Sequence, residues 1–339
     1  MHPINGSDSK GLTLTIVGCG TLGSAILSGI LQSLSDPNDT SSTDSPSPEL
    51  PSRIPSRFIA CNSSKASITR LRKTFPKEIY PNVDILQNAN VQGVNRADVV
   101  LLACKPQMAK DILTQAGMRD ALRGKLLISI LAGTSVSQFE DILGNAPRGL
   151  HEGYKGPGSY EADVDCRIVR VMPNTAALIR QSMTVIATST PPLPQEFNSL
   201  VTWIFLRIGS VRILPPSTLD TCTALCGSGP AFFALMLEAM ADGAVAMGLP
   251  RADAQFMAAQ TMKGTAGLVL NGEHPAVLRD KVSTPGGCTI GGLLVLEEGS
   301  VRGTLARGLR EAAVVASLLG EGKKGVNGTR FGGGAGYNY

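Results

Sequence analysis

Two glycine-rich stretches hold the residue types from which a binding site could be built. The first, "GCGTLG", places Gly18, Gly20 and Gly23 in the spacing GxGxxG, directly after the apolar run 14–17. In a strand, turn and helix unit, these glycines allow a sharp turn, a close approach of backbone to a pyrophosphate, and packing of the helix on the strand. The helix N-terminus attracts phosphate charge. The stretch predicts a dinucleotide site, with a ligand-free glycine turn as the alternative.

The second stretch, "VSTPGGCTIGGL" over 282–293, places a Pro-Gly-Gly turn between small hydroxyl and thiol side chains, just before an apolar helix. Taken alone, this sequence is typical of a plain turn with Thr289 as the N-cap of that helix.

The residues after the second predicted strand, "RFIAC", bear on the choice of dinucleotide. An enzyme that prefers NAD usually carries Asp or Glu near this strand end, to bind the ribose 2′-hydroxyl. This chain has Asn62, Ser63, Ser64 and Lys65 there, followed by Arg70. Small polar donors with nearby cations suit a 2′-phosphate. NADP(H) is therefore favoured and NAD(H) stays open, while a solvated helix face is the other reading of the basic side chains.

Nearly continuous apolar runs in "ADVVLLACKPQ" and "KLLISILAG" are typical of strands buried on both faces of a parallel sheet. Ligands lie outside the carboxyl ends of such strands, so 103–106 and Ala132-Gly133 should border the cofactor. These patterns predict an α/β fold, with a Rossmann-like, doubly wound, mostly parallel sheet in a domain over 11–190. Two insertions, 33–56 and 145–165, interrupt it.

The pattern becomes helical from about residue 217, and a second domain is expected over 215–320. Its first long helix has Ser228 as the expected N-cap and Gly248 as its stop, and it is apolar on nearly every face. Helices of this kind must be covered, which predicts an all-helical dimerisation domain. The Gly-rich tail, 321–339, is expected to be disordered.

Composition excludes several classes of protein. The 31 basic and 27 acidic residues are interspersed, so we expect no nucleic-acid partner. Seven cysteines without a CxxC pair or a Cys/His cluster indicate a reducing compartment and no metal site. The first ten residues lack the basic start of a signal peptide, and we expect no apolar run near the roughly 20 residues that span a bilayer. The sequence therefore predicts a cytoplasmic protein with no membrane partner.

The motifs "IVGCGTLG", "LLACKPQ", "ISILAG", "VMPNT", "CGSGPAFFALMLEAMADGAVAMGL" and "LRDKVSTPGGCTIGGLLVLE" together resemble pyrroline-5-carboxylate reductase. The resemblance covers nearly the whole chain outside the insertions and the tail, and "DKVSTPGGCTIGGLLVLE" is its most specific part. It implies an NAD(P)H-dependent enzyme that transfers hydride to the imine carbon of 1-pyrroline-5-carboxylate, giving L-proline in the final step of proline biosynthesis. It also implies a homodimer at least, with the substrate site shared between subunits.

The resemblance further implies residue roles. The loop from Thr284 through Gly286, Gly287 and Cys288 would bind the substrate carboxylate through backbone N–H groups, and the catalytic hydroxyl of Thr289 would meet the ring nitrogen. The predicted cofactor-binding residues are Gly18, Cys19, Gly20, Thr21, Leu22, Gly23, Asn62, Ser63, Ser64, Asn90, Ala103, Cys104, Lys105, Pro106, Ala132, Gly133 and Lys281. Lys281 stands where many relatives carry Asn, and Cys288 where Ala is common.

Two other functions compete with this reading. A Rossmann-type hydroxyacid dehydrogenase would place a catalytic lysine on the first long C-terminal helix, yet 231–247 contains none. A non-catalytic NADP(H)-binding regulator would keep the glycine motif without needing a small anion-binding loop.

Overall fold

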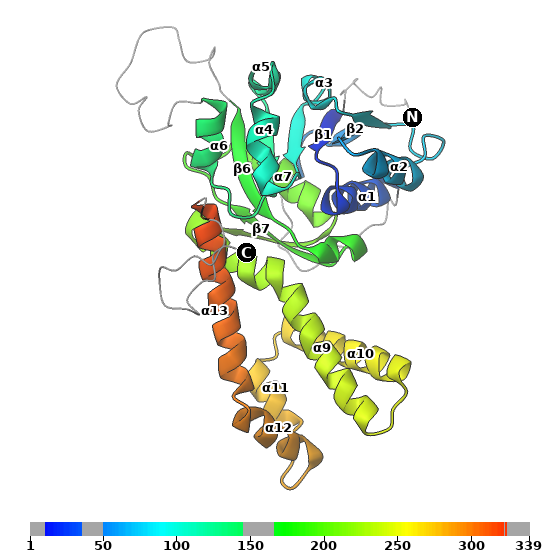
Figure 1. Ribbon diagram of the computed structural model, residues 1–339, viewed down its shortest axis with the longest axis vertical. Coiled ribbons are helices and arrows are strands. Elements are labelled where there is room, and N and C mark those ends of the chain that lie inside the picture. The colour runs from blue at the N-terminus through cyan, green and yellow to red at the C-terminus, as the bar shows by residue number, and fades with distance from the viewer. Residues whose placement is uncertain (1–10, 36–49, 145–165, 322, 324–339) are drawn as a thin grey trace, which may run out of the picture.

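The computed structural model describes residues 11–35, 50–144, 166–321 and 323. An α/β sheet domain lies at one end of the molecule, and the helices of the C-terminal third extend away from it as two separate limbs (Figure 1). The expectations for 36–49, for the insertion 145–165 and for the tail from 324 lie outside the described residues.

Eight strands form one sheet, in the order β3-β2-β1-β4-β5-β6-β7-β8. Neighbouring strands run parallel except β6 and β7, which are antiparallel. The strands are β1 (Leu12–Val17), β2 (Pro55–Asn62), β3 (Val83–Gln87), β4 (Val99–Leu102), β5 (Leu126–Ser129), β6 (Arg167–Met172), β7 (Ser182–Ala187) and β8 (Gly209–Leu214). The predicted mostly parallel sheet is confirmed.

Helices cover both faces of this sheet, which is why its central strands are apolar throughout. Every residue of β1, β4 and β5 is buried. Ile26 on one face and Phe139 on the other belong to two separate hydrophobic cores. The covering helices are α1 (Thr21–Ser35), α2 (Lys65–Thr74), α3 (Asn90–Asn95), α4 (Ala109–Leu113), α5 (Met118–Leu122), α6 (Val136–Leu143) and α7 (Gln195–Leu206).

The segment between the two expected domains belongs to the sheet. Residues 191–214 lie outside both expected domains, yet α7 packs in the core beside α1, and β8 pairs with β7 along its whole length. The α/β part of the structure therefore continues to Leu214, where the chain leaves the sheet.

The C-terminal part is helical, as the sequence predicts. Its elements are α8 (Leu219–Cys222), a π-helical segment (Thr223–Ser228), α9 (Gly229–Ala246), α10 (Arg251–Leu270), α11 (Pro275–Lys281), α12 (Cys288–Glu298) and α13 (Val301–Gly320). The expected N-cap at Ser228 is wrong: its backbone is helical, and its side chain makes no capping hydrogen bond. The chain enters α9 directly from the π-helical turn, so no free N-terminus exists there to cap.

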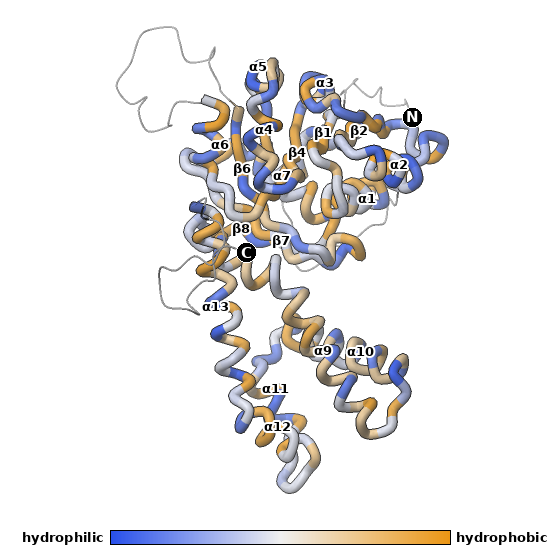
Figure 2. Tube along the Cα trace, in the orientation of Figure 1, coloured by the Kyte–Doolittle hydropathy of each residue, from blue (hydrophilic) through white to orange (hydrophobic). Residues whose placement is uncertain are grey.

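Apolar residues recur along the helices of the C-terminal module (Figure 2), and many of their side chains are exposed in a single chain. Met247 is 88% exposed, Phe256 72% and Leu235 65%. By length and composition, the segment Pro216–Ala246 could span a membrane, and only 17% of its most apolar 18-residue stretch is buried. The expectation that no run reaches this length was therefore wrong. Such a surface needs a covering partner.

Candidate active site

Apart from Lys281, the predicted nucleotide residues lie at the carboxyl edge of the sheet. Val17, near the end of β1, pairs with Cys61 in β2 and with Leu102 in β4. The segments that follow these strands therefore leave the sheet side by side. They contain the glycine loop, the polar turn that begins at Asn62, and the stretch 103–106.

The glycine loop is shaped by contacts that a side chain would break. Gly18 has φ of +78°, and a Cβ there would lie 2.6 Å from the Cα of Cys104. The N–H groups of Gly18 and Cys19 both donate to the carbonyl of Cys61, at 3.0 and 2.9 Å. A Cβ on Gly20 would meet only the oxygen of Gly18, at 3.8 Å, so the outer side of the loop is open to a ligand.

The electrostatics of this loop suit an anion. Helix α1 begins at Thr21 and has no acidic residue in its first turn, so its N–H groups present positive partial charge to the loop. Burial raises the pKa of the Cys19 thiol to about 11 and that of Cys61 to about 12. Burial likewise raises the pKa of Cys104 to about 11. All three thiols are therefore neutral near pH 7 and place no negative charge beside a pyrophosphate. These features fit a dinucleotide.

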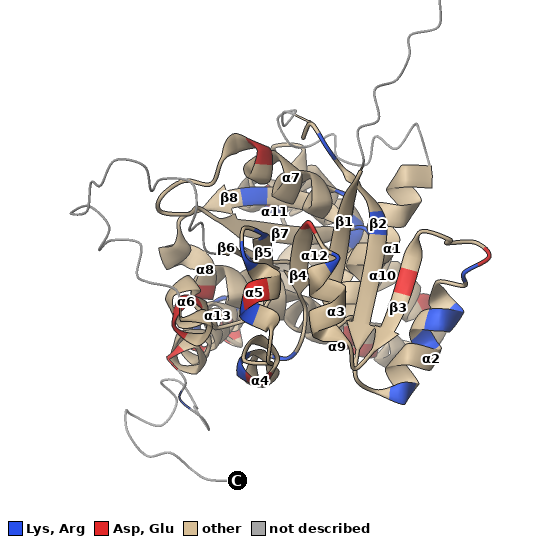
Figure 3. Cartoon of the chain, turned by 90° about the horizontal axis from the view of Figure 1, so that it is seen from above, with Lys and Arg blue, Asp and Glu red and all other residues tan. Residues whose placement is uncertain are grey.

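The polar turn after β2 is held rigidly. Asn62 donates from Nδ2 to the carbonyl of Cys19 at 3.0 Å and accepts from the N–H groups of Ser63 and Ser64 at 2.9 and 3.3 Å. Ser64 caps α2 by accepting from the N–H of Ser67 at 3.1 Å. Helix α2, which follows this turn, carries several basic residues (Figure 3), and Lys65, Arg70 and Arg72 are exposed. Among them, Arg70 is near enough to Cys19 to lower its pKa slightly against the effect of burial.

The second half of the edge comprises the segments after β4 and β5. Ala103 and Cys104 are half-buried, and Lys105 and Pro106 are exposed. After β5, Ala132 is exposed and Gly133 has φ of +72°. Their position matches the half of a Rossmann sheet that receives the second mononucleotide of a dinucleotide. Asn90, half-buried, is the first residue of α3, which follows β3.

The predicted substrate loop forms a tight turn. The N–H of Gly287 donates to the carbonyl of Thr284 at 3.0 Å, with Pro285 and Gly286 at the corners. Gly286 has φ of +69°, as the third position of a type II turn requires. A Cβ on Gly287 would lie 2.4 Å from Oγ1 of Thr284, so any other residue would force the Thr284 side chain to move.

This turn opens helix α12. Gly287 is its N-cap, and no side chain of the described residues caps it. The first N–H groups of a helix have no intrahelical partner, so those of Cys288 and Thr289 are available to an anion. Cys288 is exposed and Thr289 is half-buried, at the first and second positions of the helix.

The substrate loop and the nucleotide edge lie far apart within one chain. The loop between α11 and α12 is at the free end of the helical module, while the sheet is at the other end (Figure 1). Lys281 accordingly pairs with Glu273 at 2.7 Å and meets no nucleotide residue of its own chain. Any site that combines the two must take one part from a second chain.

The structure also shows polar contacts that the sequence analysis missed. Asn174, after β6, donates from Nδ2 to the carbonyl of Cys226 in the π-helical segment at 3.0 Å. Gln138 in α6 donates from Nε2 to the carbonyl of Gly320 at 2.6 Å. The pattern Ser135-x-x-Gln138 is a capping box and could have been found in the sequence. Its second partner, 182 residues away, leaves no local signal.

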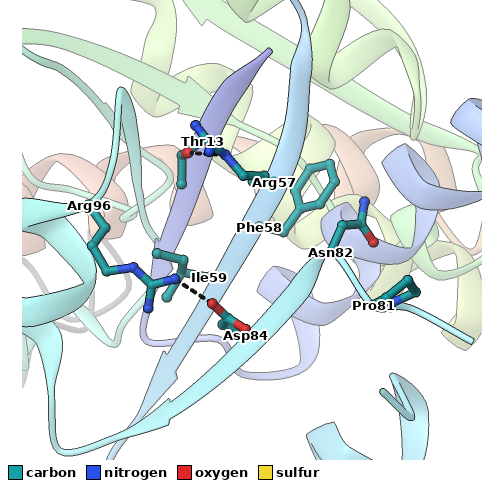
Figure 4. A pocket seen from close by; sticks show the side chains of 8 residues that line it. All are labelled: Thr13, Arg57, Phe58, Ile59, Pro81, Asn82, Asp84 and Arg96. Atoms are coloured by element: carbon teal, nitrogen blue, oxygen red, sulfur yellow. Dashed lines mark hydrogen bonds and ion pairs between the residues drawn. The ribbon is translucent and has the colours of Figure 1, made fainter. Parts of the chain in front are cut away.

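A cavity of about 360 Å³ lies at the opposite edge of the sheet, where β1, β2 and β3 begin (Figure 4). Arg96 forms an ion pair with Asp84 there, and Arg57 donates to Oγ1 of Thr13 at 3.1 Å. The basic groups already have partners. Because ligands of parallel sheets bind at the carboxyl ends of the strands, this cavity is distinct from the nucleotide site.

A Rossmann sheet with an open glycine loop, joined to an apolar helical module, defines a dinucleotide-dependent oxidoreductase that assembles through its helices. A family model described as "NADP oxidoreductase coenzyme F420-dependent" matches residues 13–133, and one described as "Pyrroline-5-carboxylate reductase dimerisation" matches 216–319. The chain belongs to the pyrroline-5-carboxylate reductase family.

Curated relatives carry the same name over almost their full length. The chain is 60% identical to the pyrroline-5-carboxylate reductase of Lophium arboricola, over 94% of this chain and 97% of that protein. It is 52% identical to the Neurospora crassa enzyme, over 95% and 97%. The Coxiella burnetii pyrroline-5-carboxylate reductase structure matches with 27% identity and a TM-score of 0.70, over 91% of this chain and 99% of that one. A Plasmodium falciparum pyrroline carboxylate reductase with NADP bound shares the fold, at 24% identity, a TM-score of 0.70 and coverage of 93% and 100%.

Proposed function

We propose that this protein reduces 1-pyrroline-5-carboxylate to L-proline with NADPH as the hydride donor. The observation that carries the proposal is the Thr284–Gly287 turn. It opens α12 with uncapped N–H groups and lies on the helical module that the dimerisation family model matches. The relatives named for this reaction, at up to 60% identity, support the substrate. The bound NADP of the Plasmodium structure and the acid-free turn after β2 support the cofactor.

In this proposal the cofactor supplies a hydride and the protein supplies placement. Gly18 and Gly20 let the backbone of the glycine loop approach the pyrophosphate, and the N-terminus of α1 stabilises its charge. Ser63, Ser64 and Arg70 bind the 2′-phosphate. The segments 103–106 and 132–133 orient the other half of the cofactor at the end of the sheet.

The substrate loop orients the imine. The N–H groups of Gly286 and Cys288 bind the carboxylate while that of Gly287 closes the turn on the carbonyl of Thr284, an arrangement that needs no fixed cation. The ring nitrogen is basic enough to arrive protonated, so its N–H donates to the hydroxyl oxygen of Thr289. Hydride adds to the imine carbon, and the electrons of the C=N π bond move to nitrogen, giving a neutral secondary amine. The chain therefore needs to position the iminium ion rather than to supply an acid.

The complete site contains two chains. The exposed apolar residues of α9 and α10 pack against a second copy, which brings the partner's substrate loop to the cofactor edge of the first chain. Burial of side chains such as Phe256 and Met247, exposed by 72% and 88% in one chain, drives the assembly. In this arrangement every dimer has two equivalent sites.

The enzyme acts in the cytoplasm, in the final step of proline biosynthesis. The seven cysteines, without a CxxC pair or a Cys/His cluster in the sequence, support a reducing compartment. The Pro216–Ala246 segment lies within the matched dimerisation region, so the partner chain accounts for its apolar surface.

The test is an assay of the purified full chain with 1-pyrroline-5-carboxylate, using NADPH and NADH in separate reactions. We expect cofactor oxidation with L-proline as the product, and a higher kcat/KM for NADPH than for NADH. A hydroxyacid with NADP⁺ serves as the comparison substrate. Oxidation of the hydroxyacid without reduction of the imine would point to a dehydrogenase. Tight NADPH binding with neither reaction would point to a regulator.

A further inference from the structure

The C-terminal end of α13 docks against the cofactor edge of its own chain. The carbonyl of Gly320, the last residue of α13, accepts a hydrogen bond from Nε2 of Gln138 at 2.6 Å. Gln138 lies in the first turn of α6, which follows the loop 131–134. That loop contains Ala132 and Gly133, which the proposed function places against the cofactor.

Two glycines allow the backbone at the end of α13 to contact the backbone of the loop 131–134 directly. A Cβ on Gly320 would lie 2.6 Å from the carbonyl oxygen of Gly133, and a Cβ on Gly133 would lie 3.2 Å from the nitrogen of Gly320. Gly133 also has φ of +72°, which disfavours any other residue. The end of α13 therefore packs directly against the loop.

Gln138 uses both ends of its side chain amide. Oε1 accepts from the N–H of Ser135 at 2.8 Å, while Oγ of Ser135 accepts from the N–H of Gln138 at 3.2 Å. Nε2 satisfies the carbonyl at the end of α13, where helix carbonyls lack intrahelical partners. One side chain thus fixes the exit of the loop and joins it to the helical module.

We infer that Gln138 and Gly320 form a positioning contact for hydride transfer: docking of α13 sets where Ala132 and Gly133 lie against the nicotinamide half of the cofactor. The inference rests on the proposed function for the identity of that cofactor. The substrate loop leads directly into α12, and α13 follows α12 in the chain. At 1.5 Å per residue its 20 residues span about 30 Å, so α13 connects a chain's substrate loop to the same chain's cofactor loop.

Two variants separate this role from a general effect on folding. In Gln138→Glu, the carboxylate still accepts from the N–H of Ser135, which preserves the capping box. It cannot donate to Gly320, and its charge opposes the negative end of α13. Gly320→Ala disturbs the same contact from the other side, because its Cβ would press on the carbonyl of Gly133, and it substitutes no residue of the loop or of α6. The control is Gln115→Glu, which adds the same charge at an exposed position of the sheet domain that is not part of the site.

The measurement compares two ligands on the full-length dimer. NADPH contains the nicotinamide, whereas 2′-phospho-ADP-ribose contains only the adenosine side. We expect both variants to raise the Kd of NADPH by about 3- to 10-fold, the range for loss of one hydrogen bond, and to slow single-turnover hydride transfer to the imine. The Kd of 2′-phospho-ADP-ribose should stay within about twofold of the parent, and the control should match the parent throughout.

Three results would overturn the inference. Parental NADPH affinity and hydride transfer in both variants would show that the contact positions nothing. Equal loss of affinity for the two ligands would show that it only stabilises the domain. A control variant that behaves like Gln138→Glu would assign the effect to charge. If one variant fails to fold, the other decides alone. If the parent does not reduce the imine, the proposed function fails, while the comparison of the two ligands still tests the contact.

Discussion

Removal of the Thr289 hydroxyl tests whether this single group binds the ring nitrogen in the proposed substrate site. Thr289 is the second residue of α12 and is half-buried beside the turn that would bind the carboxylate. In Thr289→Ala, the protonated imine loses the oxygen to which its N–H donates. Thr289→Ser keeps this oxygen and removes only a methyl group, so it is the matched control.

The expected size follows from the charge of the donor. A hydrogen bond with one charged partner contributes about 1.5–3 kcal/mol, and its loss in the transition state lowers kcat/KM for the imine by about 10- to 150-fold. In the proposed site Thr289 contacts the imine and not the cofactor, so the Kd of NADPH measured without substrate should not change.

Steady-state kinetics and equilibrium binding of NADPH on the same preparations provide the assay. Thr289→Ser should retain kcat/KM within about threefold, because the hydroxyl remains. Parental kcat/KM in Thr289→Ala would remove Thr289 from its proposed role. A parallel loss of NADPH affinity would show that Thr289 acts on the cofactor and would refute its assignment to the substrate alone.

Three further predictions concern the cofactor loop, the dimer and the thiols. Gly18→Ala forces a Cβ to within 2.6 Å of the Cα of Cys104 at φ of +78°, so NADPH affinity in a titration should fall by at least about tenfold. Phe256→Glu places a charge on a side chain that is 72% exposed in one chain, and sedimentation should show at least about 100-fold weaker dimerisation, whereas a dimer of parental stability would refute the assigned interface. Burial raises the pKa of Cys19 to about 11 and leaves its side chain without exposed surface, so at pH 8 iodoacetamide should label Cys19 far more slowly than the exposed Cys288; equal labelling rates would contradict this.

The nucleotide half of the fold could be predicted because its signals are local. The spacing of Gly18, Gly20 and Gly23 and the buried runs of β1, β4 and β5 each occupy a few consecutive residues. The turn at Gly286 is similarly encoded by its Pro-Gly-Gly sequence.

The rest depends on contacts between distant segments. The expected N-cap at Ser228 is wrong because the preceding residues continue into α9 as a π-helical turn. Asn174, which follows β6, holds this turn by donating a hydrogen bond to the carbonyl of Cys226. The contact of Gln138 with Gly320 joins residues 182 positions apart, and the distance between the substrate loop and the nucleotide edge is a property of the folded chain.

The most direct test follows the hydride itself. NADPH carrying deuterium at the transferred position of C4 is incubated with the full-length protein and 1-pyrroline-5-carboxylate, and the product is analysed by mass spectrometry. The proposed function predicts L-proline with one deuterium on the ring carbon that was the imine carbon. Proline without deuterium, or no proline although the labelled cofactor binds, would contradict it.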